Sequence, residues 1–204
     1  VALCRGDLPC AIHVQGHGVV DQSGVVDQSG EGQLSCLSKD NCSKTSFRSV
    51  AFACENQTTP VFQVQGSVLN ISEASFIGCR AGIAQAYDLA QVVVGSCNFS
   101  DVHSAFQIRG SVLSMSRTSL TSCSSRADGG VIKAYDLAQV VIEGCNFTDV
   151  HSVGFGGVVA AYGSNLSISG SLVHNCSSRS GGGAVSAFPY PDCFATNETS
   201  KTHL

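Results

Sequence analysis

The sequence has no tryptophan, a single methionine, four prolines and only 13% charged residues. Its net charge of −4 offers no overall basic surface for a phosphate backbone, which argues against nucleic acid as a partner. No run of about eighteen apolar residues occurs, so we expect no membrane span. From these absences we expect a chain that neither spans a membrane nor has nucleic acid as a partner.

The chain is rich in glycine, with 22 residues, and 43% of it is hydrophobic. This composition suits a fold that turns often around a core, and 204 residues require no more than one domain. Because the chain begins at Val1 rather than at methionine, we expect a processed or partial chain whose targeting signal has been removed.

Asparagine is found only in the motif Asn-x-Ser/Thr, the acceptor sequence for N-linked glycans. These residue types all favour turns, which explains a few matches but not all of them. The 11 cysteines agree with an oxidising compartment, and their odd number leaves at least one free or paired with another chain. We therefore predict a secreted, extracellular protein of a eukaryotic secretory pathway with N-glycans at Asn41, Asn56, Asn70, Asn98, Asn146, Asn165, Asn175 and Asn197.

One pattern recurs five times between Gly66 and Phe188, and self-similarity at this period predicts a solenoid. The copies read Gly66-Ser-Val-Leu-Asn-Ile-Ser, Asp88-Leu-Ala-Gln-Val-Val-Val, Gly110-Ser-Val-Leu-Ser-Met-Ser, Asp136-Leu-Ala-Gln-Val-Val-Ile and Gly163-Ser-Asn-Leu-Ser-Ile-Ser. Within each copy the positions at offsets 0, 2, 5, 7 and 10 are mostly apolar or small, as in Leu69, Ile71, Ala74, Phe76 and Cys79. Pairs spaced by two indicate strands, and the extra step between pairs indicates a corner.

A third strand closes each rung, with apolar residues alternating with a second, outward set. The apolar pairs are Phe62/Val64, Ala84/Ala86, Phe106/Ile108, Ile132/Ala134, Val159/Ala161 and Val185/Ala187, and the outward set is Gln63, Gln85, Gln107, Lys133, Ala160 and Ser186. Glycine pairs such as Gly129-Gly130 and Gly156-Gly157 suit tight corners. We therefore predict an all-β, right-handed parallel β-helix with three short strands per rung and rungs of about 22–27 residues. Phe76, Phe99, Leu120 and Phe147 should line up inside it.

The Gly182-Gly-Ala-Val185 segment, its variants at Gly129 and Gly156, and the Cys-Asn-Phe-x-Asp-Val turns resemble right-handed parallel β-helix repeats. They are closest to the repeats of pectin-lyase-like proteins and of polymorphic outer-membrane-type adhesins. The resemblance covers about residues 45–188 and implies the architecture rather than an activity, since the fold carries lyases, hydrolases, adhesins and structural proteins. The N-glycosylation motifs argue against a bacterial surface protein.

We divide the chain into a cysteine-containing N-terminal cap at 1–44, a β-helix at 45–194 and a polar tail at 195–204. Ala11 to Gly16 resembles Val61 to Gly66, so a first rung is expected within the N-terminal part. Candidate disulfides are Cys4–Cys10, Cys36–Cys42 and Cys54–Cys79, the last because these two cysteines fall on successive rungs. We expect most of the remaining rung cysteines to be buried thiols. Arg5-Gly6-Asp7 matches an integrin-binding tripeptide, although an ordinary polar turn is the better interpretation.

Two sets of side chains are candidates for function. The pairs Asp101/His103 and Asp149/His151 suggest metal binding or acid–base chemistry, but we interpret them as corner residues copied with their repeat. Tyr87, Tyr135, Tyr162 and Phe188 form an aromatic row beside the Gln63, Gln85, Gln107 row. The aromatic row serves either to stabilise the coil by stacking between rungs or, through Tyr87, Tyr135 and Tyr162, to contact a glycan.

Pectin-lyase-like enzymes, by the resemblance, carry clustered aspartates on one strand face, and this chain has glutamine, lysine, alanine and serine there. We therefore expect no catalytic residue, metal or cofactor. The leading hypothesis is a non-catalytic structural glycoprotein, a subunit of a fibre, appendage or cell-surface coat that self-assembles through the ends or sides of the coil. The alternatives are a polysaccharide-binding or polysaccharide-degrading protein and a cell adhesin.

Overall fold

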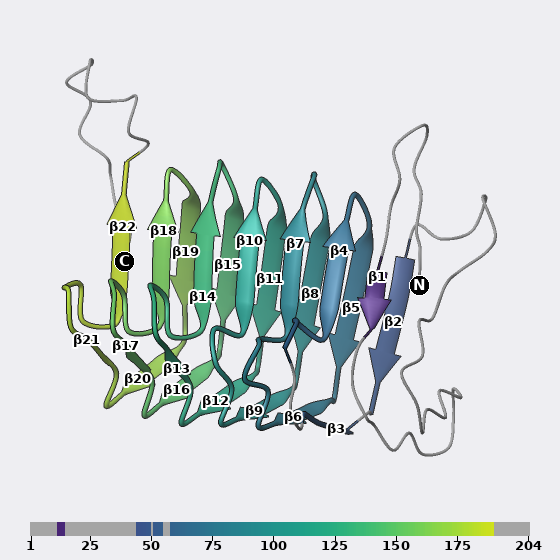
Figure 1. Ribbon diagram of the computed structural model, residues 1–204, viewed down its shortest axis with the longest axis horizontal. Coiled ribbons are helices and arrows are strands. Elements are labelled where there is room, and N and C mark those ends of the chain that lie inside the picture. The colour runs from purple at the N-terminus through teal and green to yellow at the C-terminus, as the bar shows by residue number, and fades with distance from the viewer. Residues whose placement is uncertain (1–11, 15–43, 50, 55–57, 190–204) are drawn as a thin grey trace.

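The computed structural model describes residues 12–14, 44–49, 51–54 and 58–189. These residues form a coil of about five turns, built from β-strands without a helix among them (Figure 1). Three long sheets run along the coil axis, and we name them the front, back and base sheets. None of the described residues belongs to a helix long and apolar enough to cross a membrane.

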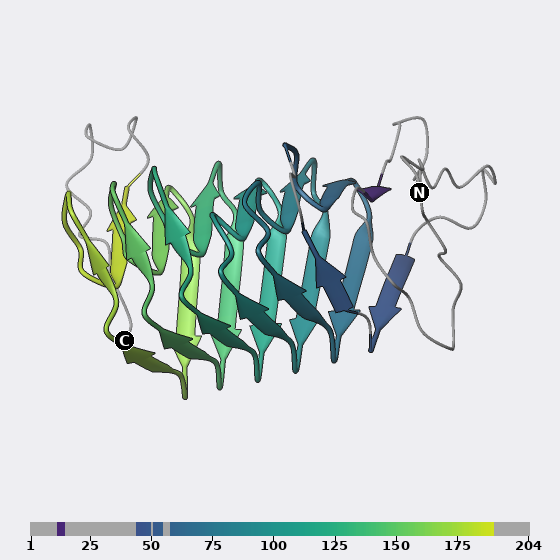
Figure 2. The same ribbon diagram turned by 60° about the horizontal axis from the view of Figure 1, so that its bottom comes forward.

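The front sheet consists of β1 (Ile12–Val14), β4 (Phe62–Gln65), β7 (Ala84–Tyr87), β10 (Phe106–Arg109), β14 (Ile132–Tyr135), β18 (Val159–Tyr162) and β22 (Val185–Phe188). The back sheet contains β2 (Lys44–Arg48), β5 (Val68–Ser72), β8 (Gln91–Gly95), β11 (Val112–Ser116), β15 (Gln139–Glu143) and β19 (Asn165–Ser169). The base sheet, which comes forward in Figure 2, contains β3 (Ala51–Ala53), β6 (Ser75–Ile77), β9 (Asn98–Ser100), β12 (Ser119–Thr121), β16 (Asn146–Thr148) and β20 (Leu172–His174).

Successive front strands begin at Phe62, Ala84, Phe106, Ile132, Val159 and Val185, which are 22 to 27 residues apart, as predicted. The longer, later rungs add a fourth strand that was not predicted from the sequence. These strands are β13 (Ser124–Ser125), β17 (His151–Ser152) and β21 (Ser177–Ser178), and they form a small corner sheet between the base and front sheets.

The corners explain the three-residue step in the apolar pattern. Between the back and base strands of one rung, Glu73 alone adopts a left-handed conformation (φ 54°), and the next rungs place Ser96 and Arg117 there with the same geometry. One such residue turns the chain and restores the inward alternation, so Ile71 and Ala74 both point into the core. The extra step is therefore a corner of one residue.

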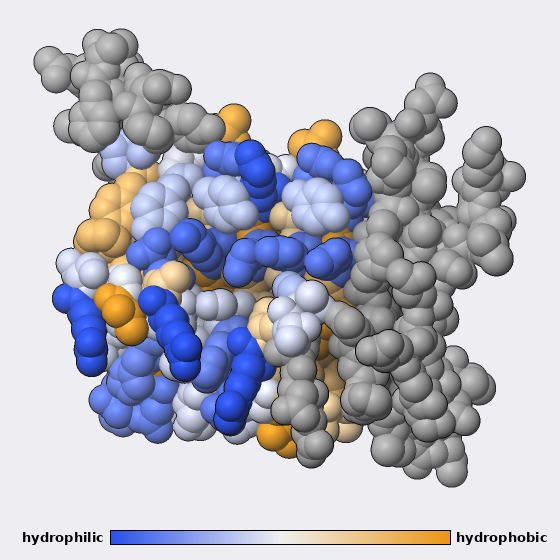
Figure 3. Space-filling view, viewed as in Figure 1, coloured by the Kyte–Doolittle hydropathy of each residue, from blue (hydrophilic) through white to orange (hydrophobic). Residues whose placement is uncertain are grey.

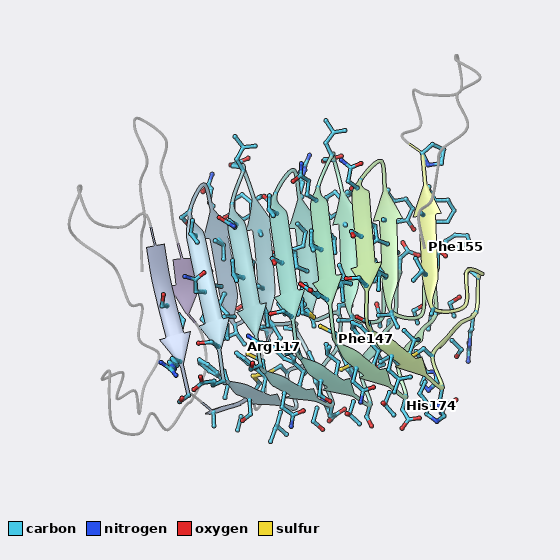
Figure 4. The ribbon with its side chains drawn as sticks, turned by 180° about the vertical axis from the view of Figure 1, so that it is seen from behind. Arg117, Phe147, Phe155 and His174 are labelled. Atoms are coloured by element: carbon cyan, nitrogen blue, oxygen red, sulfur yellow. A yellow bond between two sulfur atoms is a disulfide. The ribbon has the colours of Figure 1, made fainter. Side chains whose placement is uncertain are left out.

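Aromatic side chains stack along the interior. Phe76, Phe99, Leu120 and Phe147 lie in register on β6, β9, β12 and β16, and all four are buried, which confirms the predicted column. The Phe76 and Phe99 ring centroids are 5.0 Å apart with nearly parallel planes. Phe147 points into the coil in Figure 4. Inter-rung backbone pairing and this column together hold the rungs in register.

The first front strand runs against the others. β1 pairs with β4 in antiparallel register, with Ile12 opposite Val64 and Val14 opposite Phe62. A first rung would have to run parallel to β4. The likeness of Ala11–Gly16 to Val61–Gly66 therefore correctly predicted a strand here, but the expectation of a first rung was wrong. The first described strands that follow the rung direction are β2 and β3.

Candidate binding face

The outward side chains of the front sheet form two rows along the coil axis. The row at the second strand position is Gln63, Gln85, Gln107, Lys133, Ala160 and Ser186, and the row at the fourth is Gln65, Tyr87, Arg109, Tyr135, Tyr162 and Phe188. Within the first row, the Gln85 amide donates a hydrogen bond to Gln107 Oε1 at 3.0 Å. The predicted aromatic row is therefore interrupted, because Arg109 lies between Tyr87 and Tyr135.

Ala160 departs from the expected exposure. It occupies an outward position in register with Lys133 and Ser186, yet it is fully buried. The neighbouring Lys133 ammonium lies 5.8 Å from the centroid of the Tyr162 ring. Ser186 is also buried. Neither residue therefore adds a contact to this face.

An open groove of about 720 Å³ lies where the front sheet turns toward the back sheet. It is lined by Gln85, Ala86, Tyr87, Asp88, Leu89, Gln107, Arg109, Gly110, Tyr135 and Asp136. Figure 3 shows this face as largely hydrophilic, with hydrophobic side chains projecting along its upper edge. Tyr87 and Tyr135 thus belong to one groove, whereas Tyr162 lies outside it.

Two rung types shape the upper edge of the groove. In one type, a single left-handed residue turns the chain, as at Gly66 and Gly110. In the other, two successive left-handed residues form the turn, as at Asp88-Leu89 and Asp136-Leu137. The additional residue carries the leucine outward, where Leu89 is 88% and Leu137 75% exposed. Left-handed backbone is unfavourable for a leucine, so these projections come at a cost in stability.

Each charged side chain that lines the groove has a hydrogen-bond partner. Arg109 Nε lies 2.6 Å from Asp136 Oδ2, and its guanidinium carbon is 5.9 Å from the Tyr135 ring centroid. On the neighbouring rung, Gln65 Nε2 donates to Asp88 Oδ2 at 2.6 Å. The hydrogen bond to Asp136 raises the pKa of Arg109 above its ordinary value, so this side chain stays cationic. The pairing holds the Arg109 guanidinium beside the Tyr135 ring.

Toward the C-terminal end, the same face carries an aromatic and ionic cluster. Tyr162 stacks on Phe188 at 4.9 Å, Phe155 meets Phe188 edge-on at 5.0 Å, and Lys133 Nζ lies 3.2 Å from Asp128 Oδ2. Figure 4 shows Phe155 beside β22. Burial raises the pKa of Asp128, but hydrogen bonds from the Phe155 N–H, Tyr162 and Lys133 outweigh it and lower that pKa overall. Burial and the same carboxylate raise the pKa of Tyr162 to about 12.

The glycosylation motifs within the described residues lie away from the front sheet. Asn70 and Asn165 are on the back sheet, Asn98 and Asn146 on the base sheet, and Asn175 at the corner after β20. None of the five is buried. Asn41, Asn56 and Asn197 lie outside the described residues. In the described part of the coil, the front face is therefore the one without a glycan acceptor.

The two Asp-x-His pairs are corner residues. Asp101 and Asp149 adopt left-handed conformations (φ 52° and 55°) at the same corner, two rungs apart, and the Asn175 amide donates to Asp149. His151 Nδ1 lies 2.9 Å from Ser177 Oγ. No group of three or more His, Cys, Asp or Glu suited to a metal ion occurs where the chain is described. The geometry gives these pairs a structural role at the turn.

Cys54 and Cys79 form a disulfide between successive rungs, as predicted. Cys97, Cys123 and Cys145 are free and buried, and Cys176 is half-buried. Burial raises the pKa of all four thiols, that of Cys123 to about 11, so they remain protonated and fill core positions. The candidate pairs Cys4–Cys10 and Cys36–Cys42, and Arg5-Gly6-Asp7, lie outside the described residues.

A family model described as a right-handed beta helix region matches residues 60–189. This chain belongs to the right-handed β-helix family. The match covers the parallel rungs from β4 to the end of β22, including the whole groove. Searches of curated proteins and of solved structures found no match to the chain. Membership of the β-helix family gives the architecture and its handedness, and any function has to be argued from the faces of this particular coil.

Proposed function

We propose that this β-helix is a non-catalytic, extracellular, N-glycosylated protein whose front face binds carbohydrate. The observation that carries the proposal is the distribution of the asparagines. Five acceptor sites occupy the back sheet, the base sheet and the adjoining corner, while the front sheet keeps an open groove. Glycans on two faces would leave one face accessible to a ligand.

The groove has the chemistry that a sugar requires. Tyr87 and Tyr135 offer aromatic rings on which the C–H faces of a pyranose pack, and their hydroxyls together with the Gln85 and Gln107 amides supply hydrogen-bonding groups. The two tyrosines are two rungs apart, or about 9.6 Å at the usual strand spacing. This is close to the length of a disaccharide unit in an extended β-linked chain, so each ring would contact alternate sugars.

The arrangement of acids favours binding over catalysis. Glycoside hydrolysis needs two carboxyl groups placed on either side of the bond to be broken. Here Asp136 is engaged by Arg109, and Asp88 by Gln65, each at 2.6 Å. Both belong to corners at the edge of the groove rather than to its floor. We therefore assign these carboxylates to positioning Arg109 and Gln65.

Replacing both tyrosines by alanine should lower the affinity for the best ligand of a glycan array roughly ten- to hundredfold, because each ring contributes about 0.5–1.5 kcal/mol. Titration calorimetry on the glycosylated protein would measure this. The variant Tyr87→Phe/Tyr135→Phe keeps the rings and should bind almost normally. Retention of affinity by the double alanine variant would contradict the proposal, as would ligand breakdown that Asp88→Asn/Asp136→Asn abolishes.

A structural role through self-assembly is a second candidate, favoured by the C-terminal end of the coil. Among the described residues, β19 and β20 are the last strands of their sheets. Leu172 is 61% exposed, and Val173, which continues the Phe147 column, is 40% exposed. Open strand edges beside exposed core residues favour addition of another strand, here from a second copy of the chain.

We expect Val173→Asp to abolish any concentration-dependent oligomer seen by sedimentation velocity, since it places a charge at the end of the apolar column. Ile77→Asp is the matched control, because Ile77 is 57% exposed on β6, away from this end. Filaments or oligomers that persist in Val173→Asp, or a wild-type protein that stays monomeric at every concentration, would eliminate this candidate.

A further inference from the structure

The two ends of the coil differ in how well their core side chains are covered. At the N-terminal end, Phe52 is the first described member of the interior column, in register with Phe76, and it is only 8% exposed. β1 lies across the adjoining edge of β4. At the C-terminal end, Val173 is the last described member of the same column and is 40% exposed. Among the described residues, the C-terminal end is therefore the one that exposes the column.

The inward positions of the last rung show this opening on the other two sheets as well. β18 and β22 are the last two described strands of the front sheet (Figure 1). Ala161 on β18 is 1% exposed, whereas its neighbour Ala187 on β22 is exposed. In the back sheet, Ile142 on β15 is buried and its neighbour Ile168 on β19 is half-buried. Apolar side chains beside strand edges make this end a template for further strands.

The last rung carries almost no charge. Residues 159–188 contain no lysine, aspartate or glutamate and a single arginine, Arg179. Two identical surfaces that carry many like charges repel each other, and charged residues are a common protection of open strand edges. The C-terminal end lacks this protection, so a second copy of the same end can approach it.

We propose that the C-terminal end of the coil binds the same end of a second copy, giving a closed dimer with a twofold axis. The inference rests on the self-assembly candidate above and specifies its geometry. A fibre requires two different ends that fit each other, whereas a single open end pairs with its own copy. Assembly should therefore stop at two copies.

The three sheets allow three orientations of such a dimer, because the twofold axis can be perpendicular to any one of them. The sheet on the axis then meets its own copy, and the other two sheets exchange places. An axis through the front sheet would set the five residues of β19 against the three of β20, which leaves strand edges unmatched. Axes through the back or the base sheet pair strands that differ in length by one residue at most.

Charge decides between these two orientations. Arg179 follows β21 at the corner between the base and front sheets, and Glu143 ends β15 at the corner between the back and base sheets. Both are exposed, and neither makes an ion pair within the described residues. An axis through the back sheet brings Arg179 to its own copy, whereas an axis through the base sheet brings it to the partner's Glu143. The base axis thus gives two symmetric ion pairs and continues the interior column through Val173 of both copies.

Pulsed electron paramagnetic resonance on the purified protein tests the direction of assembly. Spin labels on p-acetylphenylalanine, which avoid the cysteines, replace either Ser46 or Val141, two exposed residues in one outward row of the back sheet. Along the axis of the proposed dimer, the two Val141 labels are separated by about 14 Å and the two Ser46 labels by about 53 Å. A head-to-tail fibre would instead give about 29 Å at both positions.

Sedimentation velocity should show a monomer–dimer equilibrium with no larger species, and Val173→Asp should be monomeric. Arg179→Glu should weaken the dimer about tenfold, because it opposes two carboxylates at both symmetric contacts, and Arg179→Glu/Glu143→Arg should restore it. Arg126→Glu is the matched control. Arg126 follows the same Cys-Ser-Ser turn two rungs before the end, so its reversal should have no effect.

Equal label distances at Ser46 and Val141, particles of more than two copies, or a charge swap that fails to restore the dimer would overturn the proposed geometry and leave the self-assembly candidate in place. A wild-type protein that is monomeric at every concentration would overturn both, and would indicate that residues 190–204 or another molecule cover the end. The groove is not involved, so Tyr87→Ala/Tyr135→Ala should dimerise like the wild type.

Discussion

Replacement of Phe99 by alanine is expected to lower the free energy of unfolding by about 3–5 kcal/mol. Phe99 is fully buried in the middle of the interior column. Its ring lies 5.0 Å from that of Phe76 and 5.7 Å from that of Phe106, with Leu120 next in register. Truncation removes these contacts and leaves a cavity, because the rungs on both sides are held at the strand spacing and cannot close the gap.

Chemical denaturation of the purified protein measures this loss, with Ile77→Ala as the comparison. Ile77 is in the neighbouring strand β6 but points outward and is 57% exposed, so its truncation should change stability by less than about 0.5 kcal/mol. Equal effects of the two substitutions would mean that the column does not form the core. Leu120→Ala should fall close to Phe99→Ala, since both belong to the column.

The register of the strands was predictable because a parallel coil places the same inward and outward positions in every rung. An inward position must be apolar or small in each copy, so the sets beginning at Leu69, Val92 and Leu113 carry the same information several times over. The disulfide followed from the same register, since Cys54 and Cys79 lie on successive rungs. The corner step was visible too, although only the structure shows that a single left-handed residue such as Glu73 produces it.

Features set by one rung alone were harder to predict. The antiparallel direction of β1 leaves no mark on its three residues, because Ile12–Val14 has the alternation of any strand. The fourth strands consist of serine and histidine pairs, which carry no apolar pattern. In the sequence, these strands correspond to the extra residues of the later rungs, where the glycine pairs predicted corners rather than strands.

The candidate face was predicted in part. The outward positions of Tyr87 and Tyr135 follow from strand alternation, but the groove depends on Arg109, which is the one charged member of its row on the intervening strand. Its ion pair with Asp136 joins a strand residue to the corner of the next rung, 27 positions later.

Gly130→Ala should destabilise the protein by at least about 3 kcal/mol, because an added methyl group has no space at this corner. A Cβ at Gly130 would lie 2.1 Å from the carbonyl oxygen of Gly157 and 3.0 Å from that of His151. Both are backbone atoms, and Gly130 N–H is itself hydrogen-bonded to Gly157 O at 3.1 Å. Relief therefore requires the corners of adjacent rungs to separate, which breaks the inter-rung ladder.

Gly95→Ala separates this steric effect from the general consequences of replacing glycine. A Cβ at Gly95 meets only Ser116 Oγ, at 3.7 Å, and its backbone is not left-handed, so this variant should match or slightly exceed the stability of the wild type. Thermal unfolding of the two variants side by side decides the matter. If the Gly130→Ala and Gly95→Ala variants unfold at the same temperature, the corners of the later rungs do not pack directly against one another.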